Sequence, residues 1–206
     1  MNFKLCFLCC AAVFRQLKLR ILKLDAIVNW PELSSDCRLM TKLLRDLTDY
    51  SMSDQLTKQR SDLCNLLRRA YLSCLPLTEG TNKTLTYTSR VSCAYMPLDS
   101  PKMMEALLNL IVNALDAISD NGSVQIILTK SNEQFVVSII DDGCGIAPKQ
   151  LLTIFHPFTT TKPDGTGLGL PVAKRIIEGH GGHIRVSSAP NQGATFTFLL
   201  PCSFFI

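Results

Sequence analysis

The spacing of hydrophobic positions changes near the middle of the chain. Over residues 31–76 apolar side chains recur at helical spacing, as at Leu39, Leu43 and Leu47, with charged residues between them. This spacing places the apolar side chains on one face of a helix. We therefore predict two amphipathic helical stretches, separated at Ser51–Asp54. They either form a dimerising hairpin or pack on the core of a following domain, and the pattern is compatible with both.

Beyond about residue 81, strand-like and helical patterns follow one another. Strands are predicted at residues 84–91, 123–130, 134–141, 183–188 and 194–200, and helices at residues 102–118 and 170–180. The first of these helices has a recognisable start, because Asp99 supplies a capping side chain and Pro101 is tolerated in the first turn. This order of elements predicts an α+β fold, a two-layer α/β sandwich in which helices cover one face of a single mixed sheet.

We divide the chain accordingly into residues 1–30, 31–80 and 81–206. The first part contains the apolar run Leu5–Phe14, which is far shorter than the roughly 20 residues that cross a bilayer. A signal-peptide core is compatible with this run, but we favour a packing segment or the start of a longer protein. The second part is expected to be a helical dimerisation or connector segment, and the third part the α+β domain.

The composition is that of a globular protein. The 206 residues are 47% hydrophobic and 18% charged, the formal net charge is +4, and no run of five like charges occurs. We therefore expect neither nucleic-acid binding nor a polybasic membrane surface. The nine cysteines are odd in number and scattered, which favours reduced thiols in a cytoplasmic protein over a disulfide framework or a zinc site.

One predicted helix carries a polar stripe. Asn109, Asn113 and Asp116 are four and three residues apart, so they share one face of an otherwise apolar helix. Polar groups in such a position are costly unless they are paired. Carboxamide and carboxylate oxygens suit a hydrated Mg²⁺ with nucleotide phosphates. An internal hydrogen-bond network would satisfy them equally well, and this segment alone leaves both explanations open.

Further candidate chemistry follows in three segments. The strand that ends at Asp141 runs into the glycines of DDGCGI, where a carboxylate can accept a hydrogen bond from an exocyclic amine, although an ordinary turn has the same residues. IFHPFTTTK, residues 154–162, supplies aromatic side chains, hydroxyls and Lys162. GTGLGL, residues 165–170, then precedes a helix, and such amides, hydroxyls and a lysine can hold phosphate. Its spacing fits neither the dinucleotide fingerprint nor the Walker loop.

Taken in order, these segments resemble the motifs of the GHKL-type ATP-binding catalytic domain of sensor histidine kinases. That domain has the Bergerat-type fold and belongs to a superfamily shared with DNA gyrase, mismatch-repair ATPases and heat-shock chaperones. The resemblance covers about residues 99–201. The matching segments are an N box at 109–117, a first glycine box at 141–146, an F box at 154–162, a second glycine box at 165–170 and a last glycine motif at 193–196.

The resemblance implies ATP and Mg²⁺ as cofactors and a role for each matching residue. Asn113 would be the Mg²⁺ ligand, with Asn109 and Asp116 beside the phosphates, and Asn109 and Lys162 would take part in catalysis. Asp141 would bind the adenine amino group. The remaining nucleotide-binding residues would be Gly143, Gly145 and Ile146 around the base, Thr160, Thr161, Lys162, Gly165, Thr166, Gly167, Leu168 and Gly169 in the phosphate lid, and Thr195 near the base.

Asn109 also bears on the reaction. Within the resemblance, hydrolysing relatives carry a glutamate here, and an asparagine cannot act as a general base toward water. The expected activity is therefore that of a protein histidine kinase in a two-component phosphorelay, with a response regulator as partner. Residues 1–80 contain no histidine, and His156, His180 and His183 lack the context of an acceptor. We therefore expect the acceptor histidine on another chain.

The segment before the catalytic domain limits this expectation. Residues 34–75 resemble the second dimerisation helix and connector of such kinases, which implies a homodimer, whereas the first helix, with its acceptor histidine, is absent or replaced by residues 1–30. The chain thus looks like the C-terminal part of a kinase and fits a truncated gene product. The alternatives are a catalytically silent ATP-binding regulator and an anti-sigma-type serine kinase. We expect a cytoplasmic protein, whose membrane attachment, if any, would be through a partner or a preceding region.

Overall fold

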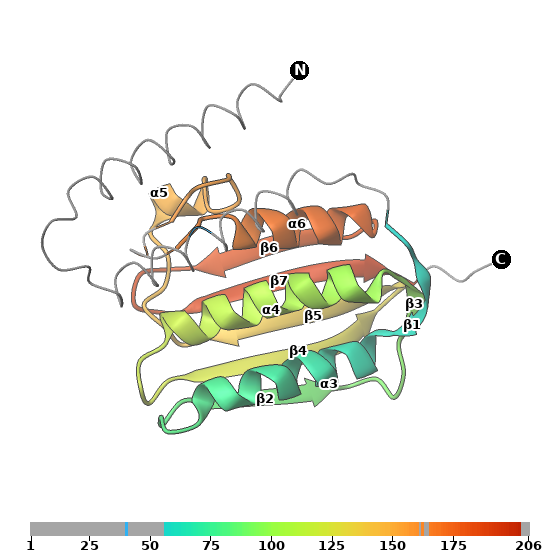
Figure 1. Ribbon diagram of the computed structural model, residues 1–206, viewed down its shortest axis with the longest axis horizontal. Helices are drawn as coiled ribbons and strands as arrows, with labels where there is room; N and C mark the ends of the chain where they lie inside the picture. The colour runs from blue at the N-terminus through green and yellow to red at the C-terminus, as the bar shows by residue number, and fades with distance from the viewer. Residues whose placement is uncertain (1–39, 41–55, 161, 163–164, 203–206) are drawn as a thin grey trace, which may run out of the picture. The chain divides into compact units, whose positions relative to one another are not determined.

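A computed structural model describes residues 56–160, 162 and 165–202, together with Met40, which is helical. The chain divides into two compact units, Met1–Leu43 and Leu44–Ile206. The second unit contains a sheet with helices on one face (Figure 1). The first predicted amphipathic stretch, apart from Met40, lies outside the described residues.

The main sheet has five strands in the order β2-β4-β5-β7-β6. The strands are β2 (Thr84–Ser89), β4 (Ser123–Ser131), β5 (Gln134–Asp141), β6 (His183–Ser188) and β7 (Ala194–Pro201). Strand β2 runs parallel to β4 and the other neighbours are antiparallel, so the sheet is mixed. The predicted hairpin of β4 and β5 is present, and Asn132 in its turn has a φ of 52°. The predicted α+β fold is confirmed.

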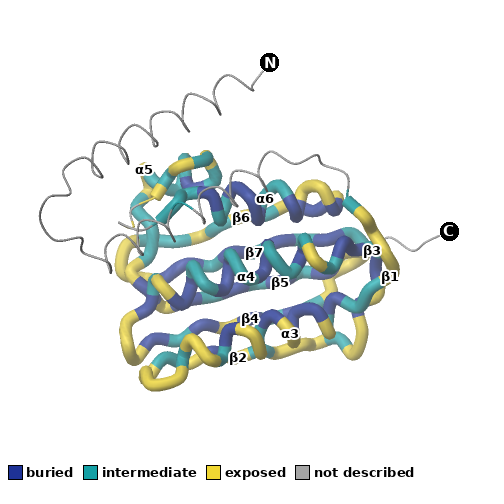
Figure 2. The backbone as a smooth tube through the Cα atoms, viewed as in Figure 1, coloured by how far each residue is buried: buried dark blue, intermediate teal, exposed yellow. Residues whose placement is uncertain are grey.

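Three helices cover one face of this sheet: α3 (Leu63–Cys74), α4 (Ser100–Ala117) and α6 (Gly169–Gly179). In β5 and β7 every second residue is buried, because alternate side chains of a strand point to opposite faces. Figure 2 shows buried segments, in dark blue, both along the helices and along the strands behind them. Within the described ranges, none of the helices has both the length and the apolarity needed to cross a membrane.

Four short elements were not predicted. They are β1 (Gln59–Asp62), the 3₁₀ turn η1 (Leu75–Thr78), β3 (Tyr95–Leu98) and α5 (Pro148–Leu151). Strands β1 and β3 form a separate antiparallel pair, so the structure has a second, two-stranded sheet in addition to the expected one. The sequence of β1, Gln-Arg-Ser-Asp, has no apolar alternation, so a pattern search does not detect it.

Helix α3 lies in the range that we assigned to a dimerisation or connector segment. Its buried residues, Leu63, Leu66, Leu67, Ala70 and Cys74, belong to the same hydrophobic core as the strands and α4. Of the two explanations left open for this amphipathic stretch, core packing is therefore the one that applies to residues 63–74. Whether the residues before 56 dimerise stays a prediction.

A buried histidine joins helices α4 and α6. The ring of His180, which ends α6, is 5% exposed. Its Nε2 accepts a hydrogen bond of 2.9 Å from the backbone N–H of Asp99, so its Nδ1 carries the proton and donates to the carbonyl of Ile176 at 2.7 Å. Asp99 in turn caps α4, because its Oδ1 accepts from the N–H of Lys102 at 3.1 Å. The end of α6 and the start of α4 are thus held together.

A second junction holds the loop after β5. Residues 143–146 lie against the turn of residues 189–193 between β6 and β7, and two backbone bonds, with a third to the hydroxyl of Ser188 at the end of β6, hold them there. The bonds are Asn191 N–H to Cys144 O (2.8 Å), Gly193 N–H to Gly143 O (3.0 Å) and Ile146 N–H to Ser188 Oγ (2.9 Å). We call these segments the glycine loop (143–146) and the clasp turn (189–193). Together they fix the backbone at the end of β5.

The buried His180 predicts a pH-dependent stability. Burial lowers its pKa, whereas in the unfolded chain its pKa is near 6.5. Between these two pKa values the unfolded state binds the proton and the native state does not, so stability falls as the pH falls through this window. We expect the free energy of unfolding to decrease as the pH falls below about 6.5, by up to about 1.4 kcal/mol per pH unit, until the lowered pKa of the folded chain is reached.

Denaturant titrations of two variants test this assignment. His180→Gln removes the titrating ring, so its stability is expected to lose this part of the pH dependence. His183→Gln, an exposed position at the start of β6, serves as the matched control and should behave as the parent chain does. An unchanged pH dependence in His180→Gln would show that another group is responsible.

The glycine loop predicts a second stability difference. Gly80 and Gly145 both have positive φ, at 74° and 68°. A Cβ at Gly80 would meet nothing, whereas a Cβ at Gly145 would collide with the carbonyl oxygen of Ala189 in the clasp turn. Gly80→Ala should cost about 1–2 kcal/mol of backbone strain. Gly145→Ala should cost clearly more, measured by urea unfolding, and equal losses would contradict the close contact with the clasp turn.

Candidate functional site

The segments singled out in the sequence meet at one end of the sandwich. The C-terminal half of α4 carries the polar stripe. At the end of this helix, the carbonyl of Ala117 accepts a hydrogen bond of 3.1 Å from the N–H of Cys144. The glycine loop thereby lies beside the end of α4. The loop before α6 reaches the same helix, because Gly169 lies against the carboxamide of Asn109.

Asp141 is the buried carboxylate of this site. It is 5% exposed, and its Oδ1 accepts backbone N–H groups from Gly143 at 3.0 Å and from Ala194 at 3.1 Å. Burial raises the pKa of this carboxyl, while the two N–H bonds act in the opposite direction. Its Oδ2 has no partner in the described part of the chain. Every fully buried side-chain oxygen in the described residues has a partner, so Oδ2, which has none, is not fully buried. It is therefore open to a ligand that donates a hydrogen bond.

The neighbouring carboxylate has a structural role. Asp142 is exposed, and its two oxygens accept from the N–H of Ser123 at 2.8 Å and from the Ser123 hydroxyl at 2.7 Å. The N–H bond from Ser123, followed by the hydroxyl bond, lowers the pKa of Asp142. Asp142 therefore ties the chain before the glycine loop to β4, whereas Asp141 offers an acceptor oxygen.

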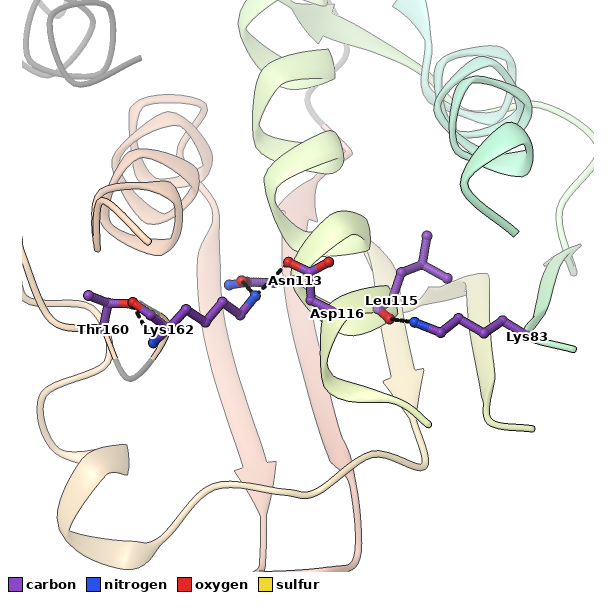
Figure 3. Close-up of polar contacts among 6 residues, drawn as sticks. All are labelled: Lys83, Asn113, Leu115, Asp116, Thr160 and Lys162. Atoms are coloured by element: carbon purple, nitrogen blue, oxygen red, sulfur yellow. Dashed lines mark hydrogen bonds and ion pairs between the residues drawn. The ribbon is translucent and has the colours of Figure 1, made fainter. Parts of the chain in front are cut away.

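The polar stripe of α4 faces a cation. The ammonium of Lys162 donates to Asn113 Oδ1 at 2.9 Å and to Asp116 Oδ2 at 2.7 Å, as Figure 3 shows. The side chains of Lys162 and Asp116 are 41% and 51% exposed. An ion pair as exposed as this one contributes little to stability, so a ligand can replace it at small cost.

These oxygens also fit a magnesium ion. Oxygen is the donor that Mg²⁺ prefers, and Mg²⁺ usually takes only one or two protein ligands and completes its shell with water and phosphate. Asn113 and Asp116 supply such oxygens, and the lysine ammonium already places a positive charge against them. The described residues contain no cluster of three or more histidine, cysteine or acidic side chains that could hold a metal by themselves.

The loop before α6 is held by its own backbone and hydroxyls. The hydroxyl of Thr160 accepts from the N–H of Lys162 at 3.0 Å, and Gly165 donates to the carbonyl of Lys162 at 3.1 Å. Gly167 accepts from the N–H of Phe158 at 3.0 Å. Leu168 is fully buried and thus anchors this loop in the core.

The remaining residues predicted for the loop lie beside these contacts or outside the structure. The hydroxyl of Thr166 accepts from the N–H of Leu168 at 3.4 Å. Gly169 is the first residue of α6, so its position is at the N-terminus of a helix. Thr161 lies outside the described residues.

One predicted site residue is not brought to Asp141. Ala194 follows the clasp turn and lies beside Asp141 in the β5–β7 register, on the helix-covered face. Thr195 is the next residue, so it points to the opposite face of the sheet, where it pairs with Ile140 and Ser187. The backbone N–H of Ala194 contacts Asp141, and the Thr195 side chain does not take that place.

The sequence reasoning also missed Lys83. This residue precedes β2, and its ammonium donates to the carbonyl of Leu115 near the end of α4 at 2.9 Å (Figure 3). A cation there satisfies a helix carbonyl that has no partner within the helix and opposes the negative end of the helix dipole. A single lysine in a loop carries no recognisable pattern, so only the fold reveals this contact.

Comparison with known proteins gives consistent matches. Residues 98–203 match the family described as histidine kinase-, DNA gyrase B- and HSP90-like ATPase. The signal transduction histidine-protein kinase AtoS of Escherichia coli (strain K12) is 36% identical over 165 residues, which cover 79% of this chain and 27% of AtoS. The chain thus spans only about a quarter of that relative.

Solved structures agree with this match. The catalytic domain of histidine kinase ThkA has a TM-score of 0.65 and 29% identity, with 71% of this chain and 96% of that chain covered. Full-length ShkA in complex with AMPPNP has a TM-score of 0.71 and 25% identity, with 79% of this chain and 35% of that chain covered. With the family match over half of its length, the chain belongs to the histidine kinase-, DNA gyrase B- and HSP90-like ATPases.

Proposed function

We propose that this chain is the catalytic domain of a protein histidine kinase in a two-component signalling system. It binds Mg²⁺-ATP and transfers the γ-phosphoryl group to a histidine on another chain. The observation that carries the proposal is the pair of recognition points at one end of the sandwich. One is the open Oδ2 of Asp141, and the other is the oxygen pair of Asn113 and Asp116 facing Lys162.

Asp141 selects the base. Its Oδ2 accepts a hydrogen bond from the amino group of adenine, while Oδ1 stays occupied by two backbone N–H groups. Gly143, Gly145 and Ile146 form the wall of the base pocket, held in place by the clasp turn. The solved complex of ShkA with AMPPNP, an analogue of ATP, supports a nucleotide in a domain of this fold.

Asn113, Asp116 and Lys162 serve the phosphates. Lys162 moves its ammonium from Asp116 to a phosphate oxygen, and Asn113 offers its Oδ1 to Mg²⁺. When bound, Mg²⁺ neutralises phosphate charge and orients the phosphate chain. The backbone N–H groups of Gly167 and Gly169, at the start of α6, add further donors to the phosphates.

Transfer is favoured over hydrolysis by the residue beside the start of α6. Asn109 lies against Gly169, and its amide cannot take a proton from water. Phosphoryl transfer depends mainly on positioning and charge, which the residues above supply to any correctly placed acceptor. The acceptor is a histidine-containing domain that passes the phosphoryl group to a response regulator.

The structure excludes one of the three histidines His156, His180 and His183 as the acceptor. His180 is excluded as an acceptor because it is buried and both of its ring nitrogens are bonded. His183 is exposed at the start of β6, next to the end of α6. We also propose a homodimer, in which the buried face of residues 63–74 would not form the contact because it packs in the core.

We keep a catalytically silent ATP-binding regulator as the second candidate. It would use the same recognition points and differ only in the absence of transfer. The matched relatives are named histidine kinases, which favours the active form.

We further propose a cytoplasmic location.

Asp141→Asn gives a sharp test of base recognition. The asparagine keeps an oxygen for Gly143 and Ala194 but turns the open atom from an acceptor into a donor. We expect ATP to bind about 10- to 100-fold more weakly in calorimetry, because a charged hydrogen bond is replaced by two facing donors. Inosine triphosphate, which carries a carbonyl at this position of the base, should lose much less affinity.

Asp142→Asn is the matched control for this experiment. Its carboxylate is bound to Ser123, so the affinity for ATP should stay within about twofold of the parent chain's, a difference of under about 0.5 kcal/mol. Equal losses for ATP and inosine triphosphate in Asp141→Asn would count against direct contact with the base. An unchanged affinity for ATP would refute the assignment of Asp141.

Transfer itself is tested with a supplied acceptor. The full chain, γ-labelled ATP and Mg²⁺ are mixed with an acceptor-histidine domain taken from AtoS. We expect an acid-labile phosphate on the acceptor. Asn113→Ala should reduce its formation at least about tenfold, because the Mg²⁺ ligand is lost. Asn132→Ala, in the β4–β5 turn, should have no effect.

The possible outcomes separate the candidates. Nucleotide binding without transfer would favour the silent regulator. An acid-stable phosphate on a serine would favour the serine kinase. Acid-labile phosphate on the supplied histidine supports the proposed activity.

A further inference from the structure

Two cysteines lie beside the end of the β1–β3 ladder. The antiparallel register pairs Gln59 with Leu98 and, at the other end, Asp62 with Tyr95. It continues by one step, because the N–H of Leu63 donates to the carbonyl of Ala94 at 2.9 Å. Cys64 follows Leu63 in the first turn of α3, and Cys93 precedes Ala94 in the loop between β2 and β3.

Asp62 holds the two backbones together at this point. Its Oδ1 accepts from the N–H of Cys64 at 3.0 Å and from the N–H of Ala94 at 2.9 Å. One carboxylate oxygen therefore binds the amide of one cysteine and the amide next to the other. This places the two cysteines on facing chain segments with little freedom to separate.

The thiol of Cys64 points toward the loop that carries Cys93. Its Sγ lies 3.8 Å from the carbonyl oxygen of Val91 and 3.8 Å from the hydroxyl of Ser89. Both residues belong to the segment that leaves β2 and leads to Cys93. Sulfur is therefore directed across the junction, which a disulfide between facing segments requires.

We propose that Cys64 and Cys93 form a reversible redox pair, a modification site at the point where the chain enters the catalytic domain. Cys93 is exposed and Cys64 is only half-buried, so an oxidant reaches the first and the second can follow. The proposal does not depend on the kinase assignment, because it uses neither the nucleotide nor the acceptor.

The two thiols differ in their surroundings, and this sets the order of events. Burial raises the pKa of the Cys64 thiol, the nearby carboxylate of Asp62 acts in the same direction, and so does Cys93, whereas the Ser89 hydroxyl opposes them. A thiol with a raised pKa is a poor first nucleophile. Exposed Cys93 therefore reacts first and Cys64 completes the bond.

A disulfide oxidant such as oxidised glutathione balances the reaction. The Cys93 thiolate attacks one sulfur of the oxidant, forms a mixed disulfide and releases one glutathione thiolate. The Cys64 thiolate then attacks the Cys93 sulfur, forms the intramolecular disulfide and releases the second glutathione. Two protein thiols are oxidised, one glutathione disulfide is reduced, and each thiol proton passes to solvent or to a released thiolate.

The cross-link would close a ring from α3 to the loop before β3. This ring contains α3 and β2, and α3 carries Leu63 and Leu67 into the core. A cross-link of this kind restricts the unfolded chain and thereby stabilises the folded domain. The redox state of the pair would thus set the stability of the corner that connects β1 to the main sheet.

The experiment uses the full chain, treated with oxidised glutathione, alkylated and digested for mass spectrometry. We expect a peptide pair joined through Cys64 and Cys93, and a melting temperature raised by several degrees that returns on reduction. Cys64→Ser and Cys93→Ser should each lose both effects. Cys202→Ser, a partly exposed cysteine at the end of β7, is the control that should retain them.

Peptide mapping of the parent chain decides the outcome even if a variant folds poorly. Separate glutathione adducts on Cys64 and Cys93 after prolonged oxidation, with no joined peptide, would overturn the proposal. A joined peptide in which either cysteine is bonded to a different partner would overturn it as well. A joined Cys64–Cys93 peptide that leaves the melting temperature unchanged would refute the proposed effect on stability.

Discussion

The site depends on a single buried carboxylate oxygen. Oδ1 of Asp141 accepts the N–H of Gly143 and the N–H of Ala194, and these two groups come from the glycine loop and from the start of β7. A buried oxygen with two donors fixes both segments, since losing either bond would leave a buried polar group unsatisfied. The backbone of the pocket and the acceptor that faces it are therefore set by the same side chain.

Helix α4 connects this end of the domain to the other. Its apolar face packs in the core, its polar stripe faces Lys162, and its start is joined through Asp99 to the buried ring of His180. A change at the start of α4 or at the end of α6 therefore acts on the helix that carries Asn113. The junction of Asp99 with His180 and the polar stripe therefore lie on one and the same helix.

Most of the fold could be predicted from the sequence because its signals are local. The β4–β5 hairpin follows from two alternating runs around a polar turn, and the start of α4 follows from Asp99 and Pro101. Strand β1 could not be predicted, since a polar strand of four residues has no recognisable pattern. The packing of α3 could not be predicted either, since an amphipathic sequence does not show which surface its apolar face contacts.

The candidate site was predicted to a similar extent and for the same reason. The stripe of α4 follows from helical spacing, and its nearness to Lys162 was an implication of the family resemblance. The contact of Lys83 with Leu115 depends on the tertiary structure, and the bond from Ala194 to Asp141 comes from a backbone N–H. Neither can be recognised from the residue types in the sequence. Thr195 shows the limit of motif matching, because a shift of one residue along a strand reverses the face.

The contact of Lys162 with Asp116 has one more consequence. A counter-ion attached to the same chain is present at a high effective concentration, which dilution does not reduce. Free cations in solution must compete with it for the oxygens of Asn113 and Asp116. A metal ion that arrives with a polyphosphate has an advantage over a metal ion alone, because the phosphate gives the displaced ammonium a new anionic partner. Under the proposed function, the tethered lysine would favour the metal–nucleotide complex over its separate parts.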